Sequence, residues 1–199
     1  MSSSPQPVAD LLADLARGFH ALGVRWFLFG AQAAILHGAA RLSADVDVTV
    51  DLGARSSREV VDTLSREGFE LRLADVAGFV EATRVIPLVH VASRMPLDLV
   101  LAGPGLEEQF FVRATERVVG HARVPVVSAE DLVAMKILAG RPRDVEDVAA
   151  VIRARRDLDV EGVRSTLRLL ERALDRADLV LELERVLARA KIGTVGPNS

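Results

Sequence analysis

The fold is decided by the stretch Phe27-Leu-Phe-Gly-Ala-Gln-Ala-Ala-Ile-Leu-His-Gly-Ala-Ala-Arg-Leu-Ser-Ala-Asp-Val-Asp-Val-Thr-Val-Asp51. Its apolar start predicts a buried strand that ends at Gly30, followed by a short helix that ends at Gly38. The segment 45–51 then alternates valine with aspartate or threonine. At the two-residue period of a strand, the valines face one way and the polar side chains the other. This pattern predicts a second strand with one polar face.

The two strands suggest a phosphate site followed by a metal site. A strand that ends at glycine and enters a helix exposes backbone N–H groups and the positive end of the helix dipole, and Gly30 leaves room for a phosphate. Asp45 and Asp47 lie about 6–7 Å apart on one strand face, where both can reach one hard divalent cation. The alternative is a half-exposed edge strand after an ordinary β-turn-α corner. It explains less, because aspartate is disfavoured in strands and neighbouring like charges repel.

Composition limits the class of protein. The 199 residues suit one domain, or a domain with a helical appendage, and can bury a substantial core. No apolar run approaches the ~20 residues needed to cross a bilayer, and the start lacks the basic and apolar regions of a secretory signal. The absence of cysteine excludes disulfides and thiolate metal sites. We therefore expect a cytoplasmic protein without membrane association, and the net charge of −3 gives no global field that attracts nucleic acid.

Strands and helices follow one another in a mostly non-alternating order. Helical spacing predicts a first helix over 8–22, and strands are expected at 84–92 and 97–101. From Ser128, which opens a capping box with Asp131, the pattern is helical. We expect an α+β fold, or α/β with a small mixed sheet, in which residues 1–127 form the core, 128–192 a helical C-terminal part and 193–199 a tail.

Asp98 interrupts the apolar strand expected at 97–101. A single carboxylate among apolar residues needs a partner. It could pair with an arginine or lie exposed at a sheet edge.

The central stretch resembles the signature of the polymerase-β-like nucleotidyltransferase superfamily in Gly30-Ala31, His37-Gly38, Arg41, Ser43 and Asp45-x-Asp47. The spacing His-Gly-x-x-Arg-x-Ser-x-Asp-x-Asp is most similar to the abortive-infection nucleotidyltransferases of type IV toxin–antitoxin systems. The chain departs from the superfamily at Ala31, where a second glycine or a serine is usual, so only a backbone donor remains there. The resemblance covers roughly residues 24–152.

A second segment resembles the same group, in which a lysine helix precedes an Arg-Asp-x-x-Asp helix. Here the residues are Lys136, Arg143, Asp144 and Asp147. Asp144 and Asp147 share a helix face and Arg143 can pair with Asp147, so a structural role that ties two helices together is at least as good an interpretation as a catalytic one. Lys136, one of two lysines in an arginine-rich chain, suits a compact ammonium at a triphosphate, with a snorkelling surface lysine as the alternative.

The resemblance implies transfer of a nucleoside monophosphate from an NTP, with ATP binding expected, to an acceptor hydroxyl. It implies that Mg²⁺ or Mn²⁺ is held by Asp45, Asp47 and a third carboxylate, Asp98, which would also take the acceptor proton. The residues expected at the nucleotide phosphates are Gly30, Ala31, Arg41, Ser43 and Lys136. The residues expected to support the site from behind are His37, Arg143, Asp144 and Asp147.

The resemblance also suggests tRNA as the acceptor and a cognate antitoxin as the partner. An aminoglycoside or lincosamide antibiotic and a protein hydroxyl are the other candidate acceptors. The rival from another class is a non-catalytic module that keeps the fold and binds a nucleotide or a protein, or serves as an antitoxin-like partner. The change at Ala31 favours this rival, whereas three retained carboxylates argue against it.

Overall fold

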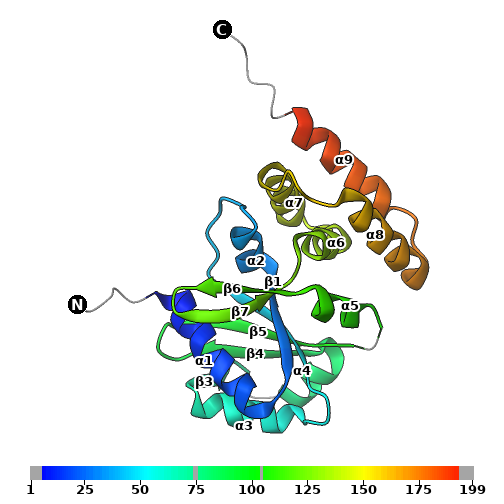
Figure 1. Ribbon diagram of the computed structural model, residues 1–199. Coiled ribbons are helices and arrows are strands. Elements are labelled where there is room, and N and C mark those ends of the chain that lie inside the picture. Colours follow the sequence, from blue (N-terminus) through cyan, green and yellow to red (C-terminus); the bar gives the residue numbers. More distant parts are fainter. Residues whose placement is uncertain (1–5, 74–75, 104, 193–199) are drawn as a thin grey trace. The chain divides into compact units, whose positions relative to one another are not determined.

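The structure, a computed structural model, describes residues 6–73, 76–103 and 105–192, so the predicted tail 193–199 lies outside the described residues. The chain divides into two compact units (Figure 1). The first is built from residues up to 32 together with 43–127, and it contains the sheet. The second is built from residues 33–42 together with the chain from 128 onward, and it is helical. The predicted mixed α and β class is confirmed.

The first unit contains a seven-stranded mixed sheet in the order β3-β4-β5-β2-β1-β7-β6. The described strands are β1 Arg25–Phe29, β2 Val46–Asp51, β3 Phe69–Leu71, β4 Val85–His90, β5 Met95–Leu101, β6 Thr115–Val119 and β7 Ala122–Val126. β2 is central, antiparallel to β1 and parallel to β5. The strand predicted over 45–51 is thus confirmed, although it begins one residue later, at Val46. Its three valines are fully buried, as the alternation predicts.

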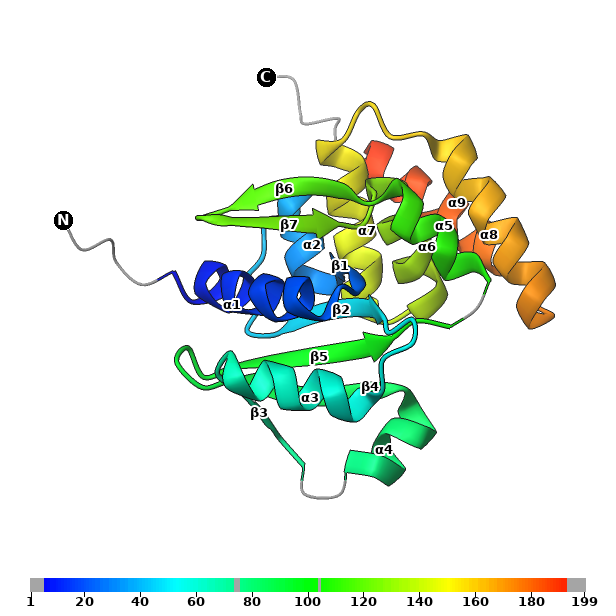
Figure 2. The same ribbon diagram turned by 60° about the horizontal axis from the view of Figure 1, so that its bottom comes forward.

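Helices of the first unit cover the sheet. They are α1 Pro7–Leu22, α3 Ser57–Arg66, α4 Val76–Thr83 and α5 Leu106–Arg113. α1 and α3 pack side by side (Figure 2), and the apolar stripe of α1, including Leu12 and Leu15, is fully buried. Ser56 and Glu59 close a capping box that fixes the start of α3. α2, Gly30–Leu36, begins in this unit and ends in the second one.

The second unit packs four described helices, α6 Ala129–Ala139, α7 Pro142–Ala154, α8 Val160–Leu174 and α9 Leu179–Ile192, together with the segment 33–42. α6 contacts each of the other three. Gly38 has a φ of 103°, and a Cβ added to it would overlap the Cβ of Ala154. Only glycine meets both conditions, so Gly38 lets the middle of the segment 33–42 lie directly on α7. None of the described helices combines the length and apolar composition that crossing a bilayer requires.

Candidate active site

Asp47 lies against the turn that opens α2. Gly30 has a left-handed φ of 66°, a backbone conformation that favours glycine because glycine has no side chain. A Cβ built at Gly30 would lie 2.7 Å from Cγ of Asp47 and would overlap its Oδ2. The glycine therefore brings the half-buried Asp47 carboxylate beside the main chain at the start of α2.

Asp98 is the register partner of Asp47. β2 and β5 run parallel, and the two aspartates are directly paired across them. Directly paired residues on neighbouring strands point to the same face of a sheet, about 4.8 Å apart at the backbone. The structure thus brings these two predicted metal ligands together on one face, at half-buried positions.

Arg72 forms an ion pair with Asp98, which gives this carboxylate an arginine partner. Arg72 follows β3, and its backbone N–H donates to the carbonyl of Pro87 at 3.0 Å. Pro87 in β4 is in turn the register partner of Asp98. Arg72, Pro87, Asp98 and Asp47 therefore form a row across the sheet, and the arginine side chain reaches past Pro87 to the carboxylate.

Asp45 stands just before β2 and is exposed. Its Oδ1 accepts a hydrogen bond from Ser43 Oγ at 2.5 Å. The buried Gln32 side chain donates to the carbonyls of Ser43 and Asp45, each at 3.3 Å, which fixes this loop. Within the described part of the chain, no three acidic or histidine side chains lie close enough to hold a metal ion. The register thus brings the carboxylates of Asp47 and Asp98 together, and Asp45 lies outside that pair.

The Asp47–Asp98 pair nevertheless fits a hard divalent cation by its donor chemistry. Both ligands are carboxylates, which supply the oxygen atoms that Mg²⁺ and Mn²⁺ prefer. They occupy one sheet face at half-buried positions, and the Asp47 carboxylate takes the place that a Cβ at residue 30 would fill. Two carboxylates directly opposite each other repel, so an added cation stabilises the arrangement.

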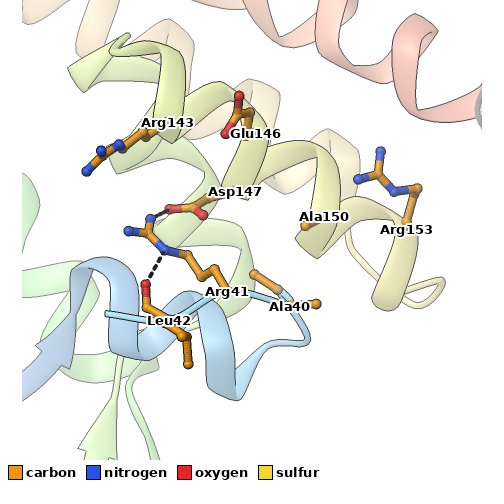
Figure 3. Close-up of a pocket in the computed structure, with 9 residues that line it drawn as sticks. Ala40, Arg41, Leu42, Arg143, Glu146, Asp147, Ala150 and Arg153 are labelled. Atoms are coloured by element: carbon orange, nitrogen blue, oxygen red, sulfur yellow. Dashed lines mark hydrogen bonds and ion pairs between the residues drawn. The ribbon is translucent and has the colours of Figure 1, made fainter. Parts of the chain in front are cut away.

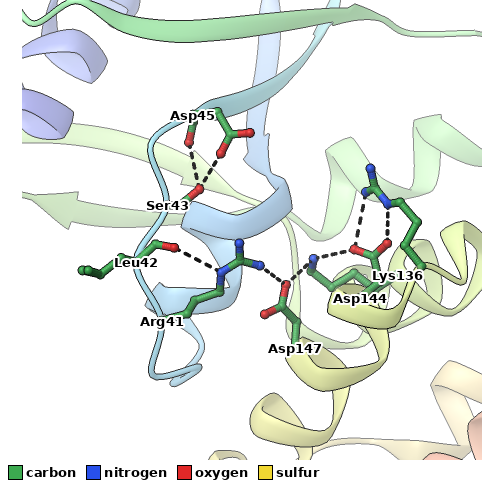
Figure 4. Close-up of polar contacts among 8 residues, drawn as sticks. Arg41, Leu42, Ser43, Asp45, Lys136, Asp144 and Asp147 are labelled. Carbon is green, nitrogen blue, oxygen red and sulfur yellow. Dashed lines mark hydrogen bonds and ion pairs between the residues drawn. The ribbon is translucent and has the colours of Figure 1, made fainter.

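Arg41 and Lys136 lie in the second unit, around Asp147. Arg41 Nη1 lies 2.8 Å from Asp147 Oδ2 (Figure 3). Lys136 Nζ donates to the same oxygen at 2.7 Å and to Asp144 Oδ1 at 3.0 Å (Figure 4). Arg141 Nε donates to Asp144 Oδ2 at 2.6 Å. We call these five residues the Lys136 cluster.

The Lys136 cluster is buried at its centre. The side chains of Lys136, Asp144 and Asp147 are 7%, 4% and 5% exposed. Burial alone would raise the pKa of the Asp144 carboxyl, but hydrogen bonds from Arg141 and Lys136 outweigh it and hold that pKa below its ordinary value. The Asp144 carboxyl therefore stays ionised, and the bonds of Lys136 to Asp144 and Asp147 tie α6 to α7.

His37 and Arg143 lie outside this cluster. His37 is 3% exposed, and its Nδ1 lies 3.3 Å from Nη1 of Arg155. Arg143 is exposed, and Asp147 is bound by Lys136 and Arg41 in its place. Sequence reasoning did not single out Arg72 or Arg141, and no local signal distinguishes them among the many arginines of the chain.

Solved structures of other proteins show which fold this chain has. The fold is similar to the solution structure of the antibiotic-resistance factor ANT(2'')-Ia, with a TM-score of 0.58 and 16% identity over 89% of this chain and 96% of that chain. For the crystal structure of ANT(2'')-Ia with adenylyl-2''-tobramycin, the TM-score is 0.57 and the identity 15%, over 84% of this chain and 98% of that chain. For an antigenic nucleotidyltransferase-like protein from Paracoccidioides brasiliensis, the TM-score is 0.50 and the identity 18%, over 91% of this chain and 94% of that chain. The chain thus has the nucleotidyltransferase fold, with a helical C-terminal part.

The sequence places the chain within that class. The model of the family described as "Nucleotidyl transferase AbiEii toxin, Type IV TA system" matches residues 11–192. The chain belongs to this family and is a nucleotidyltransferase, which confirms the resemblance seen in its motifs. Among curated proteins, none matches the sequence significantly.

Proposed function

We propose that this nucleotidyltransferase moves a nucleoside monophosphate from an NTP to a hydroxyl of tRNA, as the toxin of a type IV toxin–antitoxin pair in the cytoplasm. The observation that carries the proposal is the in-register pair Asp47–Asp98 beside Gly30. A carboxylate pair on one sheet face, next to a main-chain turn without a side chain, suits a cation-bound triphosphate. The family supports the toxin role and the antitoxin partner.

In this proposal Asp47 and Asp98 hold Mg²⁺ or Mn²⁺, and Asp45 joins them. Asp45 is exposed and held by the Ser43 hydroxyl, a neutral partner that a cation can replace. The bound cation would neutralise triphosphate charge and lower the pKa of the acceptor hydroxyl. Asp98, which is half-exposed, would accept the proton of that hydroxyl after its ion pair with Arg72 has opened.

The nucleotide phosphates are proposed to contact the backbone N–H groups at Gly30 and Ala31, the Ser43 hydroxyl and the Arg41 guanidinium. Arg41 is partly exposed; it bonds to Asp147 through Nη1 and to the Leu42 carbonyl through Nε, so Nη2 remains as a donor. A phosphate contact from Lys136 is the alternative to its buried ion pairs with Asp144 and Asp147. To make that contact its ammonium would have to leave one of two buried carboxylates, and the variants described in the Discussion test this requirement.

A second acceptor class is suggested by the fold relatives. The ANT(2'')-Ia structures concern an antibiotic-resistance factor and its adenylyl-2''-tobramycin complex. An aminoglycoside is therefore the second candidate acceptor. A non-catalytic module is the third alternative, and Ala31 is the residue that favours it.

The test is incubation of the protein with each α-labelled NTP and Mg²⁺ or Mn²⁺, in parallel with total tRNA, tobramycin, lincomycin or a protein extract. We expect label on tRNA, and loss of that label when EDTA is present. If only tobramycin or only protein is labelled, tRNA is not the acceptor and the labelled compound takes its place. No labelled product in any reaction would support the non-catalytic module.

A further inference from the structure

A groove of about 460 Å³ lies in the helical unit, between α7 and the segment 39–42 (Figure 3). Three arginines line it: Arg41 from the segment, and Arg143 and Arg153 from α7. Figure 3 shows Arg143 and Arg153 at opposite ends, with Arg41 between them. We call this feature the α7 groove.

The α7 groove carries an excess of available positive charge. Of its two acidic residues, Asp147 is already bound by Lys136 and Arg41. Arg143 and Arg153 are exposed and form no ion pair with any described residue. Glu146 is the one remaining carboxylate of the lining, against two guanidinium groups. An anion that enters the groove can thus bind the guanidinium groups of Arg143 and Arg153 without breaking an existing ion pair.

The spacing of the arginines favours an extended anion over a single phosphate. Arg143 and Arg153 are ten residues apart on one helix, so their backbones are about 15 Å apart at 1.5 Å per residue. Figure 3 shows their side chains at opposite ends of the groove, so in this arrangement one phosphate does not contact both. The phosphates of one strand in a stacked helix are spaced about 3.4 Å along the helix axis. A strand therefore places several phosphates within this length.

We propose that the α7 groove binds the phosphate backbone of the single-stranded RNA end that carries the acceptor hydroxyl. The proposal rests on the proposed function and adds to it where the acceptor is held. Guanidinium groups bind phosphate oxygens through two parallel hydrogen bonds, which suits exposed, unpaired arginines. Leu42, also in the lining and 96% exposed, offers an apolar side chain to a base. Two unpaired arginines would repel an aminoglycoside, which is a polycation, so the groove favours RNA over the antibiotic acceptor.

The strand also has to end close to the proposed metal ligands. Arg41 is four residues before Asp45 in the sequence. Four residues span at most about 14 Å, at 3.3–3.6 Å each. Chain connectivity alone thus keeps the backbone of Arg41 within this length of the backbone of Asp45.

The experiment measures binding of a fluorescein-labelled twelve-nucleotide RNA by anisotropy, in the intact protein without NTP, at several salt concentrations. The double variant Arg143→Gln/Arg153→Gln should bind at least about tenfold more weakly. Its plot of log affinity against log salt should be shallower by about 1.4, because each single-strand phosphate contact contributes about 0.7. The matched control is the same substitution twice in exposed arginines of other elements, Arg117→Gln/Arg172→Gln.

The control should change the affinity less than twofold, and Arg143→Lys/Arg153→Lys should keep the salt slope. Equal losses in the double variant and its control would overturn the proposal, as would wild-type protein that does not bind the RNA. Displacement of the RNA by millimolar inorganic phosphate, beyond that by sulfate of equal ionic strength, would also overturn it, because the site would then take a single phosphate.

The same proteins are assayed for transfer of label to tRNA, which separates the two proposals. Wild-type protein that labels tRNA, with a groove variant that binds RNA like the control, would overturn the groove and leave the function standing. Wild-type protein that transfers no label, with RNA binding lost as expected in the groove variant, would overturn the function and support the groove.

Discussion

The Asp47–Asp98 pair and the Lys136 cluster both place two carboxylates near a cation, but in different surroundings. In the sheet, the side chains of Arg72 and Asp98 are 35% and 41% exposed. In the helical unit, the corresponding values are 7% for Lys136, 4% for Asp144 and 5% for Asp147. A cation from solvent can therefore replace the Arg72 guanidinium at Asp98, whereas the Lys136 ammonium is enclosed by protein.

The difference in exposure separates binding from stability. An exposed ion pair is worth about 0–1 kcal/mol, so Arg72 can yield Asp98 to another cation at little cost. Removal of one partner from a buried ion pair costs about 3–5 kcal/mol, because the other charge stays buried without compensation. We therefore expect the sheet pair to respond to ligands and the Lys136 cluster to hold the helices.

The largest effect is expected for Lys136→Met, which keeps the length of the side chain and removes its charge. Asp144 and Asp147 would keep Arg141 and Arg41 as partners but would repel each other in a buried site, so the free energy of unfolding should fall by about 3 kcal/mol, the lower end of the range for a broken buried pair. Urea unfolding followed by circular dichroism measures it. Asp62→Asn, at an exposed carboxylate of α3, is the control and should change little.

The same variant tests Lys136 as a phosphate contact. If Lys136 binds the triphosphate rather than the two aspartates, Lys136→Met stays as stable as wild type and loses about ten- to a hundredfold in NTP affinity, from a charged hydrogen bond of about 1.5–3 kcal/mol. Lys136→Arg should restore part of that affinity. A stable Lys136→Met protein would therefore contradict the division between binding and stability drawn above.

The next effect is loss of transfer in Asp47→Asn, which keeps the side-chain shape and removes a metal charge. We expect at least about a hundredfold lower rate, since a cation ligand acts on the transition state directly. The melting temperature should be unchanged or higher, because repulsion across the register from Asp98 is removed. Asp51→Asn at the other end of β2 is the control. Transfer at the wild-type rate would refute the metal assignment.

A smaller effect is expected for Arg72→Gln. Without the guanidinium, Asp98 is free for a cation, and Mn²⁺ affinity should rise about three- to fivefold, the equivalent of an exposed ion pair near the upper end of its range. Electron paramagnetic resonance of free Mn²⁺ measures this without NTP. Arg117→Gln on the edge strand β6 is the control. Unchanged affinity would mean that Asp98 does not bind the cation.

The smallest effect concerns pH and the exposed arm of the Lys136 cluster. The pKa of the Asp144 carboxyl lies below its ordinary value of 3.8, so its ionised form stabilises the fold above about pH 4 and that stabilisation is lost as the pH falls through the folded pKa. Arg141, 76% exposed, supplies part of it. Arg141→Gln should therefore lower stability by less than about 1 kcal/mol at pH 7. The difference from wild type should shrink below pH 3.8, as melting temperatures against pH would show.

Local sequence patterns predicted the elements well. The alternation over 45–51 predicted β2 and its buried valines, and helical spacing predicted α1 and the helices from Ser128. These features depend on neighbours along the chain, which a sequence displays directly. The expected strand at 97–101 is likewise the end of β5.

Pairings between distant segments were not predictable in the same way. No residue near Asp98 in the sequence indicates that β5 pairs with β2, or that the register of this pairing sets Asp98 beside Asp47. Arg72 follows a three-residue strand without periodicity, and the chain holds too many arginines for one to stand out. Burial of the Lys136 ammonium depends on how α6 meets α7, because Asp144 and Asp147 supply its counter-charges.

The close fit of Gly38 on Ala154 has a consequence for how the protein can be divided. The chain changes unit after residues 32, 42 and 127, so the segment 33–42 belongs to the helices although sheet residues flank it on both sides. A fragment that ends at residue 127 keeps this segment without α7, and one that starts at 128 lacks it. The two units therefore cannot be exchanged between relatives by a single crossover. Gly38 and the α7 that faces it must be inherited together.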